Sequence, residues 1–230
     1  MKYSHIICIG DSFTNEKQCY QDNGVLDILN SKNYEFKSYP EILSEIYECP
    51  YELRGAPGRT MNFTINDLID SIDYILTLEN PLIIYQFGYF FNSTLRLDDN
   101  THLIWKDFLF EKNTHIVINE KSKLVSGLKP EDKNSIIHWY QNFEEYRNYY
   151  YIDTFLTIKN MINRIKPIDM YGIVLWGTKF KLPITKSIID LTHLKYEGIN
   201  SVFSDIEEYH KSTNDNIKLA TEIKDIITNV

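Results

Sequence analysis

Short apolar runs punctuate this chain, and several of them end in glycine. The apolar residues in these runs are consecutive and do not alternate with polar ones, which is typical of strands covered on both faces in a parallel sheet. The predicted strands are 6–9, 51–53, 82–88, 170–177 and the weaker 187–190.

Between these runs the apolar residues follow helical spacing. The predicted helices cover 40–47, 65–76, 136–165 and 219–227, and the third is either one long helix or two broken near 149–153. A strand, a helix and a strand joined by short loops form a βαβ unit, whose right-handed crossover makes the strands parallel. The pattern therefore predicts an α/β fold, a three-layer α/β/α sandwich around a mostly parallel five-stranded sheet.

Residues 89–132 interrupt this rhythm. Within them, the sequence around Lys121–Ser122 is typical of a hairpin, and we interpret the whole stretch as an insertion after the third strand. Because no internal repeat or low-complexity linker occurs, we expect a single domain over 1–230.

Composition narrows the classes of function. The chain has 230 residues, a net charge of −8 and a pI near 5.3, which gives no reason to expect nucleic acid or an anionic membrane as a partner. No run approaches the roughly 20 apolar residues of a membrane span, and the first apolar segment is too short for a secretory leader. We expect a cytoplasmic protein. The three cysteines include no CxxC pair, which indicates reduced thiols and no metal site, and the oligomeric state stays open.

Candidate catalytic residues follow the predicted strands, because functional residues in open parallel sheets gather at the carboxyl ends of strands. Ser12 lies in Gly-Asp-Ser after the first strand, and Asp190 and His193 form a DxxH motif after the last. A serine nucleophile needs a histidine base that is itself oriented by a carboxylate. A second DxxH, Asp99–His102, lies in the insertion and is interpreted as a chance match. Cys19 is a weaker candidate nucleophile.

This set of motifs resembles the SGNH (GDSL-type) hydrolases, on four short blocks between Ile6 and about Phe203. The resemblance implies a flavodoxin-like sandwich and an esterase without a metal or organic cofactor. It implies that Ser12 is the nucleophile, His193 the base and Asp190 its orienting residue. The backbone N–H groups of Ser12 and Gly55 would bind the oxyanion.

The third block departs from the family pattern, which is Gly-x-Asn-Asp. Phe90 stands at the position of the Asn, whose side chain supplies a third oxyanion donor, and Asn92 follows two residues later. Leu53 also replaces an Asn that often begins the second block. Loss of one oxyanion donor typically lowers the rate by about 10²–10³-fold. We therefore include Asn92 as a candidate replacement donor.

Five residues near these blocks are candidates for substrate binding. Asp11 adjoins the serine, Arg54 and Arg59 flank the glycine loop, and Tyr89 and Phe90 follow the third strand. The arginines could bind a carboxylate or phosphate, or be solvated loop charges. The aromatic residues could line a pocket for an acyl chain or a sugar, or belong to the core beneath the insertion.

The sequence thus favours an ester hydrolase that acts on a small-acyl ester, such as an O-acetylated carbohydrate. The alternative is a weakly active or inactive relative that uses the same cleft to bind a glycan or a protein. A flavodoxin-like nucleotide or flavin binder is a third reading, but neither GxGxxG nor a P-loop occurs.

Overall fold

The structure is a computed structural model, and it describes residues 2–57, 61–88, 93–96, 102–105, 149–175, 185–204, 206 and 210–229. Seven strands have assigned bounds: β1 His5–Ile9, β2 Tyr51–Arg54, β3 Pro81–Phe87, β4 Ser93–Arg96, β5 His102–Trp105, β6 Asp169–Val174 and β7 Ile188–Asp190. The helices are α1 Glu16–Asp22, α2 Val25–Ser31, α3 Tyr39–Tyr47, α4 Met61–Asp70, α5 Ile72–Thr77 and α7 Thr213–Thr228, with a further helix over 149–165 and a 3-10 turn at Ile199–Ser201.

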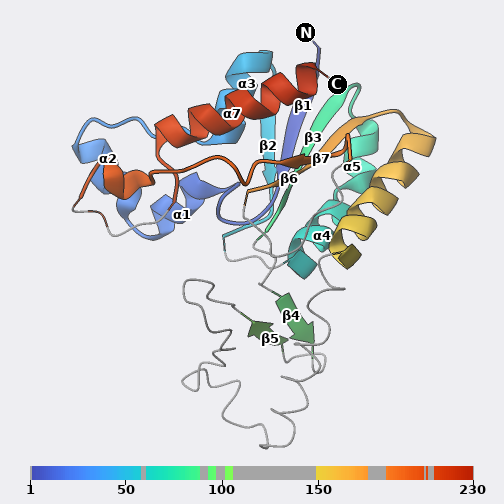
Figure 1. Cartoon of the computed structure of the whole chain (residues 1–230), viewed down its shortest axis with the longest axis horizontal. Coiled ribbons are helices and arrows are strands. Elements are labelled where there is room, and N and C mark those ends of the chain that lie inside the picture. The colour runs from blue at the N-terminus through green and yellow to red at the C-terminus, as the bar shows by residue number, and fades with distance from the viewer. Residues whose placement is uncertain are drawn as a thin grey trace, which may run out of the picture.

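Five of these strands form one sheet in the order β2-β1-β3-β6-β7, and every neighbouring pair is parallel. The sheet lies between two layers of helices (Figure 1). One layer contains α3 and α7, and the other contains α4, α5 and the helix over 149–165. The predicted three-layer α/β sandwich is confirmed.

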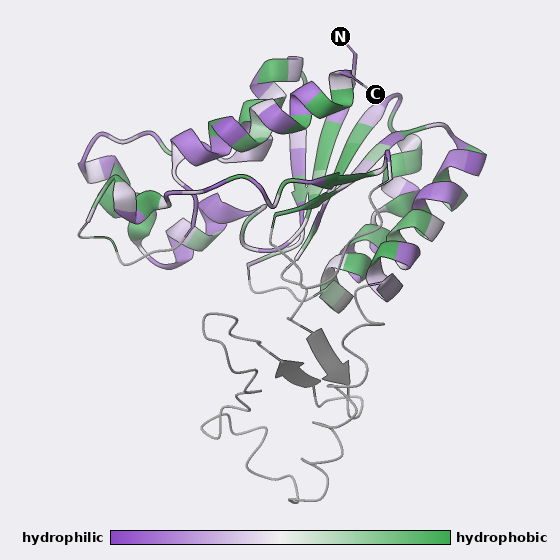
Figure 2. Ribbon diagram, in the orientation of Figure 1, coloured by the Kyte–Doolittle hydropathy of each residue, from purple (hydrophilic) through white to green (hydrophobic). Residues whose placement is uncertain are grey.

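Alternate residues of each central strand supply the two cores. In β1, Ile7 and Ile9 pack against the α4 side, whereas Ile6 and Cys8 pack against α3 and α7. All seven residues of β3 are buried, as expected for a strand covered on both faces. Figure 2 shows the resulting distribution, with apolar strands inside and polar residues on the outer faces of the helices.

The helices differ most from the sequence prediction. The predicted helix 65–76 is two helices, α4 and α5, separated at Ser71, whose hydroxyl donates to the Asp67 carbonyl oxygen. The sequence analysis missed α1 and α2 entirely. They form a third, smaller cluster with the segment before α7, including Tyr20, Leu29 and Ile199.

Part of the predicted insertion is described. Its strands β4 and β5 form a separate antiparallel pair, and β4 adjoins α4. The predicted hairpin around Lys121–Ser122 and the first half of the predicted helix 136–165 lie outside the described residues. The single-domain organisation stays a prediction. Among the helices described, none combines the length and the apolar character that crossing a membrane requires.

Candidate active site at the carboxyl edge of the sheet

The parallel sheet brings the predicted loops to one edge. β1 ends at Ile9, β2 at Arg54, β3 at Phe87 and β7 at Asp190, so the loops with Ser12, Gly55, Gly88 and His193 all leave this edge. The first three strands are direct neighbours, whereas β6 separates β7 from β3. The edge thus has a compact part around Ser12 and a more distant part around His193.

Glycines allow the compact part to close. Gly55 has φ +109°, and a Cβ there would lie 2.2 Å from the carbonyl oxygen of Gly10. A Cβ on Gly10 would in turn lie 2.2 Å from Thr14 Oγ1. Only glycine fits such a positive φ combined with such a close backbone approach. The glycines of the first two blocks therefore put the Ser12 loop against the Gly55 loop.

The buried side chain of Asp11 holds the Ser12 loop by hydrogen bonds to β3 and to Phe13. Its buried carboxylate accepts hydrogen bonds at Oδ1 from Gln86 Nε2 (2.8 Å) and from the backbone N–H of Phe13 (2.9 Å). Burial raises the pKa of the Asp11 carboxyl, although these hydrogen bonds and the charge of Lys211 oppose the rise. Thr14 Oγ1 donates to Gln86 Oε1 and lies 3.1 Å from the Tyr39 hydroxyl. A buried series of hydrogen bonds between side chains thus connects β3, the Ser12 loop and α3.

Ser12 itself is only partly buried. Within the described part of the chain, its hydroxyl and its backbone N–H form no hydrogen bond, and the N–H of Gly55 forms none either. Three polar groups on two adjacent loops are therefore available to a ligand. Two of them are the N–H groups that the sequence analysis assigned to the oxyanion.

His193 and Asp190 lie on the turn after β7, but they face different partners. His193 is exposed, and its Nε2 lies 3.7 Å from Oε1 of Glu222 on α7. Asp190 Oδ1 accepts the N–H of Thr192 at 3.0 Å. Among the described residues, neither side chain hydrogen bonds to the other or to Ser12. The predicted triad stays a prediction, with its serine and its histidine at the same sheet edge.

The other predicted residues divide into two groups. Arg54 is described: its guanidinium pairs with Glu52 at 2.5 Å and stacks over the Tyr74 ring at 4.8 Å. The remaining candidates lie outside the described residues: Arg59, Tyr89, Phe90 and Asn92. Their proposed roles in binding substrate and oxyanion stay predictions.

Sequence reasoning missed several residues that support the Ser12 loop. Gln86 is a buried amide inside an otherwise apolar strand, and this anomaly was a usable signal. Glu16 and Lys211 form a fully buried ion pair at 2.9 Å, although both occur in polar stretches typical of solvated charges. His210 stacks on Phe13, with ring centroids 4.7 Å apart, and its Nδ1 lies 4.0 Å from Cys19 Sγ. The sequence around these residues contains no pattern that predicts these contacts.

The surroundings of the sheet offer a cleft but no metal site among the described residues. Among the described residues, no group of three or more His, Cys, Asp or Glu side chains is placed to hold a metal ion. A cleft of about 430 Å³ lies between α1, α2, α3 and the start of β2, and none of the predicted site residues lines it. Both lysines that line it are paired, Lys17 with Glu41 and Lys37 with Glu45, each at 2.7 Å, and Glu35 lies 3.9 Å from Lys37.

Comparison with known proteins adds no relative. No protein-family profile, no curated protein and no solved structure matches this chain.

Proposed function

We propose that this protein is a serine ester hydrolase of the GDSL type. The observation that carries the proposal is the set of available groups on two adjoining loops: the Ser12 hydroxyl, the Ser12 N–H and the Gly55 N–H. A nucleophile beside two backbone donors is the arrangement that acyl transfer requires, because the donors stabilise the negative charge that develops on the carbonyl oxygen.

The reaction follows from these groups. Ser12 Oγ attacks the ester carbonyl while His193 takes the hydroxyl proton, and the carbonyl oxygen becomes an oxyanion facing the two N–H groups. The intermediate collapses when the ester C–O bond breaks, and His193 returns the proton to the departing alcohol. Water then attacks the acyl-serine by the same route, which releases the acid and regenerates Ser12.

His193 must turn for this chemistry. Its imidazole is exposed and faces Glu222, a contact between two partly exposed side chains that is worth little in free energy. Exposed side chains change rotamer within picoseconds to nanoseconds, so the turn toward Ser12 is not a kinetic obstacle. In the reactive rotamer, we propose that Asp190 orients the imidazole.

We propose a small-acyl ester as the substrate, such as an O-acetylated carbohydrate. This substrate class follows from the resemblance of the sequence motifs to the SGNH hydrolases. It is tested separately, by comparing p-nitrophenyl esters with O-acetylated glycans. Arg54 is already engaged by Glu52 and Tyr74, so a role in binding an anionic substrate would require it to leave these partners.

A second candidate function is binding without catalysis. The contact of His193 with Glu222, and not with Asp190, favours it. In this case the loops of Ser12 and Gly55 would hold a glycan or a protein group by the same N–H donors. The two candidates differ in one respect that can be measured, which is turnover.

The test is hydrolysis of p-nitrophenyl acetate and butyrate by the wild type, Ser12→Ala and His193→Ala. Ser31→Ala and His5→Ala are matched controls, because Ser31 is an exposed serine on α2 and His5 begins β1 at the opposite edge of the sheet. We expect turnover that is lost in the two site variants and kept in the two controls.

Equal rates of p-nitrophenyl ester hydrolysis in all five proteins would indicate a background reaction with nucleophiles on the protein surface. The same five proteins are then tested on O-acetylated glycans, because a strictly specific esterase could ignore p-nitrophenyl esters. Failure on both substrate classes would contradict the hydrolase proposal, and glycan binding without turnover would favour the second candidate.

A further inference from the structure

Lys211 is a lysine buried directly behind the Ser12 loop. Its side chain is 1% exposed, and its Nζ donates to the Phe13 carbonyl oxygen at 3.1 Å and to Glu16 Oε1 at 2.9 Å. Its backbone N–H also donates to Glu16 Oε1, at 3.0 Å. One residue of the segment before α7 thus contacts both the middle of the loop between β1 and α1, at Phe13, and the first residue of α1, Glu16.

Further side chains surround the Lys211–Glu16 ion pair. The second oxygen of Glu16 accepts Asn216 Nδ2 at 2.8 Å, and the ammonium lies 4.7 Å from the Phe13 ring centroid. Burying an ion pair gives little net stability, because removing both charges from water offsets most of their attraction. A buried pair of this kind contributes more to fixing one geometry than to the free energy of unfolding.

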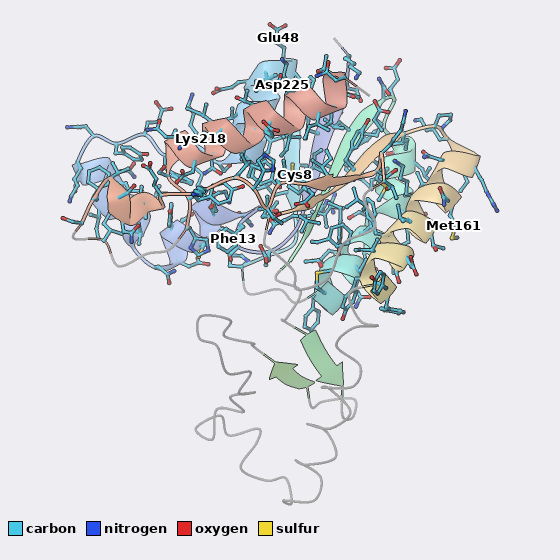
Figure 3. All side chains as sticks on the ribbon, in the orientation of Figure 1. Cys8, Phe13, Glu48, Met161, Lys218 and Asp225 are labelled. Carbon is cyan, nitrogen blue, oxygen red and sulfur yellow. The ribbon has the colours of Figure 1, made fainter. Side chains whose placement is uncertain are left out.

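That geometry concerns the residues on either side of Ser12. Asp11 is held by Gln86, and Phe13 is held at its carbonyl oxygen by Lys211 and at its N–H by Asp11. Ser12 lies between these two fixed neighbours, with its own N–H and hydroxyl available. Figure 3 labels Phe13, which lies close to α1.

Lys211 also ends the segment that carries His193. Its carbonyl oxygen accepts the Tyr20 hydroxyl at 3.0 Å, and Ser212, the next residue, caps α7. Lys211 thus lies beside the Ser12 loop and belongs to the same connection between β7 and α7 as His193.

We propose that Lys211 is a positioning residue for the Ser12 nucleophile, acting through the Phe13 carbonyl oxygen and in partnership with Glu16. The inference rests on the proposed function and deepens it. A misplacement of about 1 Å in a reacting group can lower a rate by about 10²-fold, so a loop that is folded but loosely held has a measurable consequence.

The test replaces the ion pair with a neutral pair, Glu16→Gln/Lys211→Met. Replacing both charges avoids an uncompensated buried charge, which would unfold many chains. The matched control is Lys159→Met. Lys159 is another partly buried lysine, which donates to the Met170 carbonyl oxygen at 2.7 Å and to Ser187 Oγ at 2.6 Å, at the opposite edge of the sheet.

Three quantities are measured on each protein: the melting temperature, kcat and KM for the best ester found, and the rate at which a fluorophosphonate labels Ser12. We expect the double variant to lose about 10–10²-fold in kcat and in labelling rate, with KM changed by less than about threefold. Lys159→Met should keep both rates within about threefold of the wild type, even where it melts at an equally low temperature.

The outcomes separate the two proposals. A folded double variant that labels and turns over at the wild-type rate overturns the positioning role and leaves the hydrolase intact. Equal losses in the double variant and in Lys159→Met also overturn it, because they would reflect general destabilisation. A wild type that neither turns over nor labels overturns both proposals at once.

Discussion

The two halves of the candidate site are built differently. Around Ser12, the supporting side chains of Asp11, Gln86, Glu16 and Lys211 are buried and hydrogen-bonded. Around His193, the side chain is exposed and touches Glu222 at 3.7 Å. The fold therefore fixes the Ser12 loop through buried hydrogen bonds, whereas it leaves the His193 side chain exposed. Under the proposed function, His193 would reach Ser12 by a change of rotamer.

The largest effect is expected on kcat, and it distinguishes the roles of the two carboxylates near His193, those of Asp190 and Glu222. Asp190→Asn should lower kcat by about 10⁴-fold if Asp190 orients the base during turnover, as loss of the orienting carboxylate does in other triads. Glu222→Gln should change kcat by less than about threefold, because its contact with His193 is partly exposed and is broken before reaction. Steady-state kinetics on the two variants decide the matter, and the reverse ranking would assign Glu222 as the orienting residue.

The second effect compares the stability of the two halves. Glu16→Gln leaves the Lys211 ammonium buried without its counter-charge and should lower the free energy of unfolding by about 3–5 kcal/mol. Glu222→Gln, on the exposed half, should lower it by no more than about 1 kcal/mol. Urea denaturation measures both, and similar values for the two variants would remove the contrast between the halves.

A third effect concerns the contact between the Ser12 and Gly55 loops. Gly55 has a φ of +109°, and a Cβ at this position would lie 2.2 Å from the carbonyl oxygen of Gly10. Gly55→Ala should therefore lower the free energy of unfolding by about 3 kcal/mol. Gly88→Ala is the control, since the nearest atom to its Cβ is Asp11 Oδ2 at 3.2 Å and its φ is not positive. Its effect should stay near 1 kcal/mol. Thermal unfolding of both variants checks the difference.

The smallest effect is a change of stability with pH. Burial raises the pKa of Asp11 above its ordinary value, so the folded state favours the protonated carboxyl. Its contribution to stability is then fully present below the ordinary pKa and is lost as pH rises through the folded-state pKa. Relative to Asp11→Asn, the wild type should therefore lose stability as pH rises across this window. A constant difference in the free energy of unfolding between the two proteins would contradict the assignment.

The sheet was predictable because its strands are local features of the sequence. The run at Ile6–Ile9 and the run that became β3 are apolar without alternation, and burial on both faces follows directly from that pattern. Because the strands were predicted to be parallel, Ser12, Gly55 and His193 were expected at the same edge of the sheet, where their loops lie. The small shifts at strand ends arise because a strand ends where its neighbour stops pairing, which the sequence does not encode locally.

The helices α1 and α2 were not predictable in the same way. In α1 the buried residues are Glu16, Cys19 and Tyr20, which do not form a continuous apolar stripe. The helix is stabilised by contacts with the segment before α7, and Glu16 finds its partner Lys211 195 positions later in the chain. Such tertiary pairs override local preference, and sequence periodicity carries no trace of them.

Whether Ser12 is a nucleophile activated by His193 can be decided by covalent labelling with a fluorophosphonate, followed by peptide mapping of the wild type and His193→Ala. The reagent reports an activated serine whatever the natural ester is. We expect one labelled residue, Ser12, and a labelling rate that falls by several orders of magnitude in His193→Ala. A wild type that stays unlabelled at Ser12, or an equal labelling rate in His193→Ala, would show that Ser12 is not a histidine-activated nucleophile.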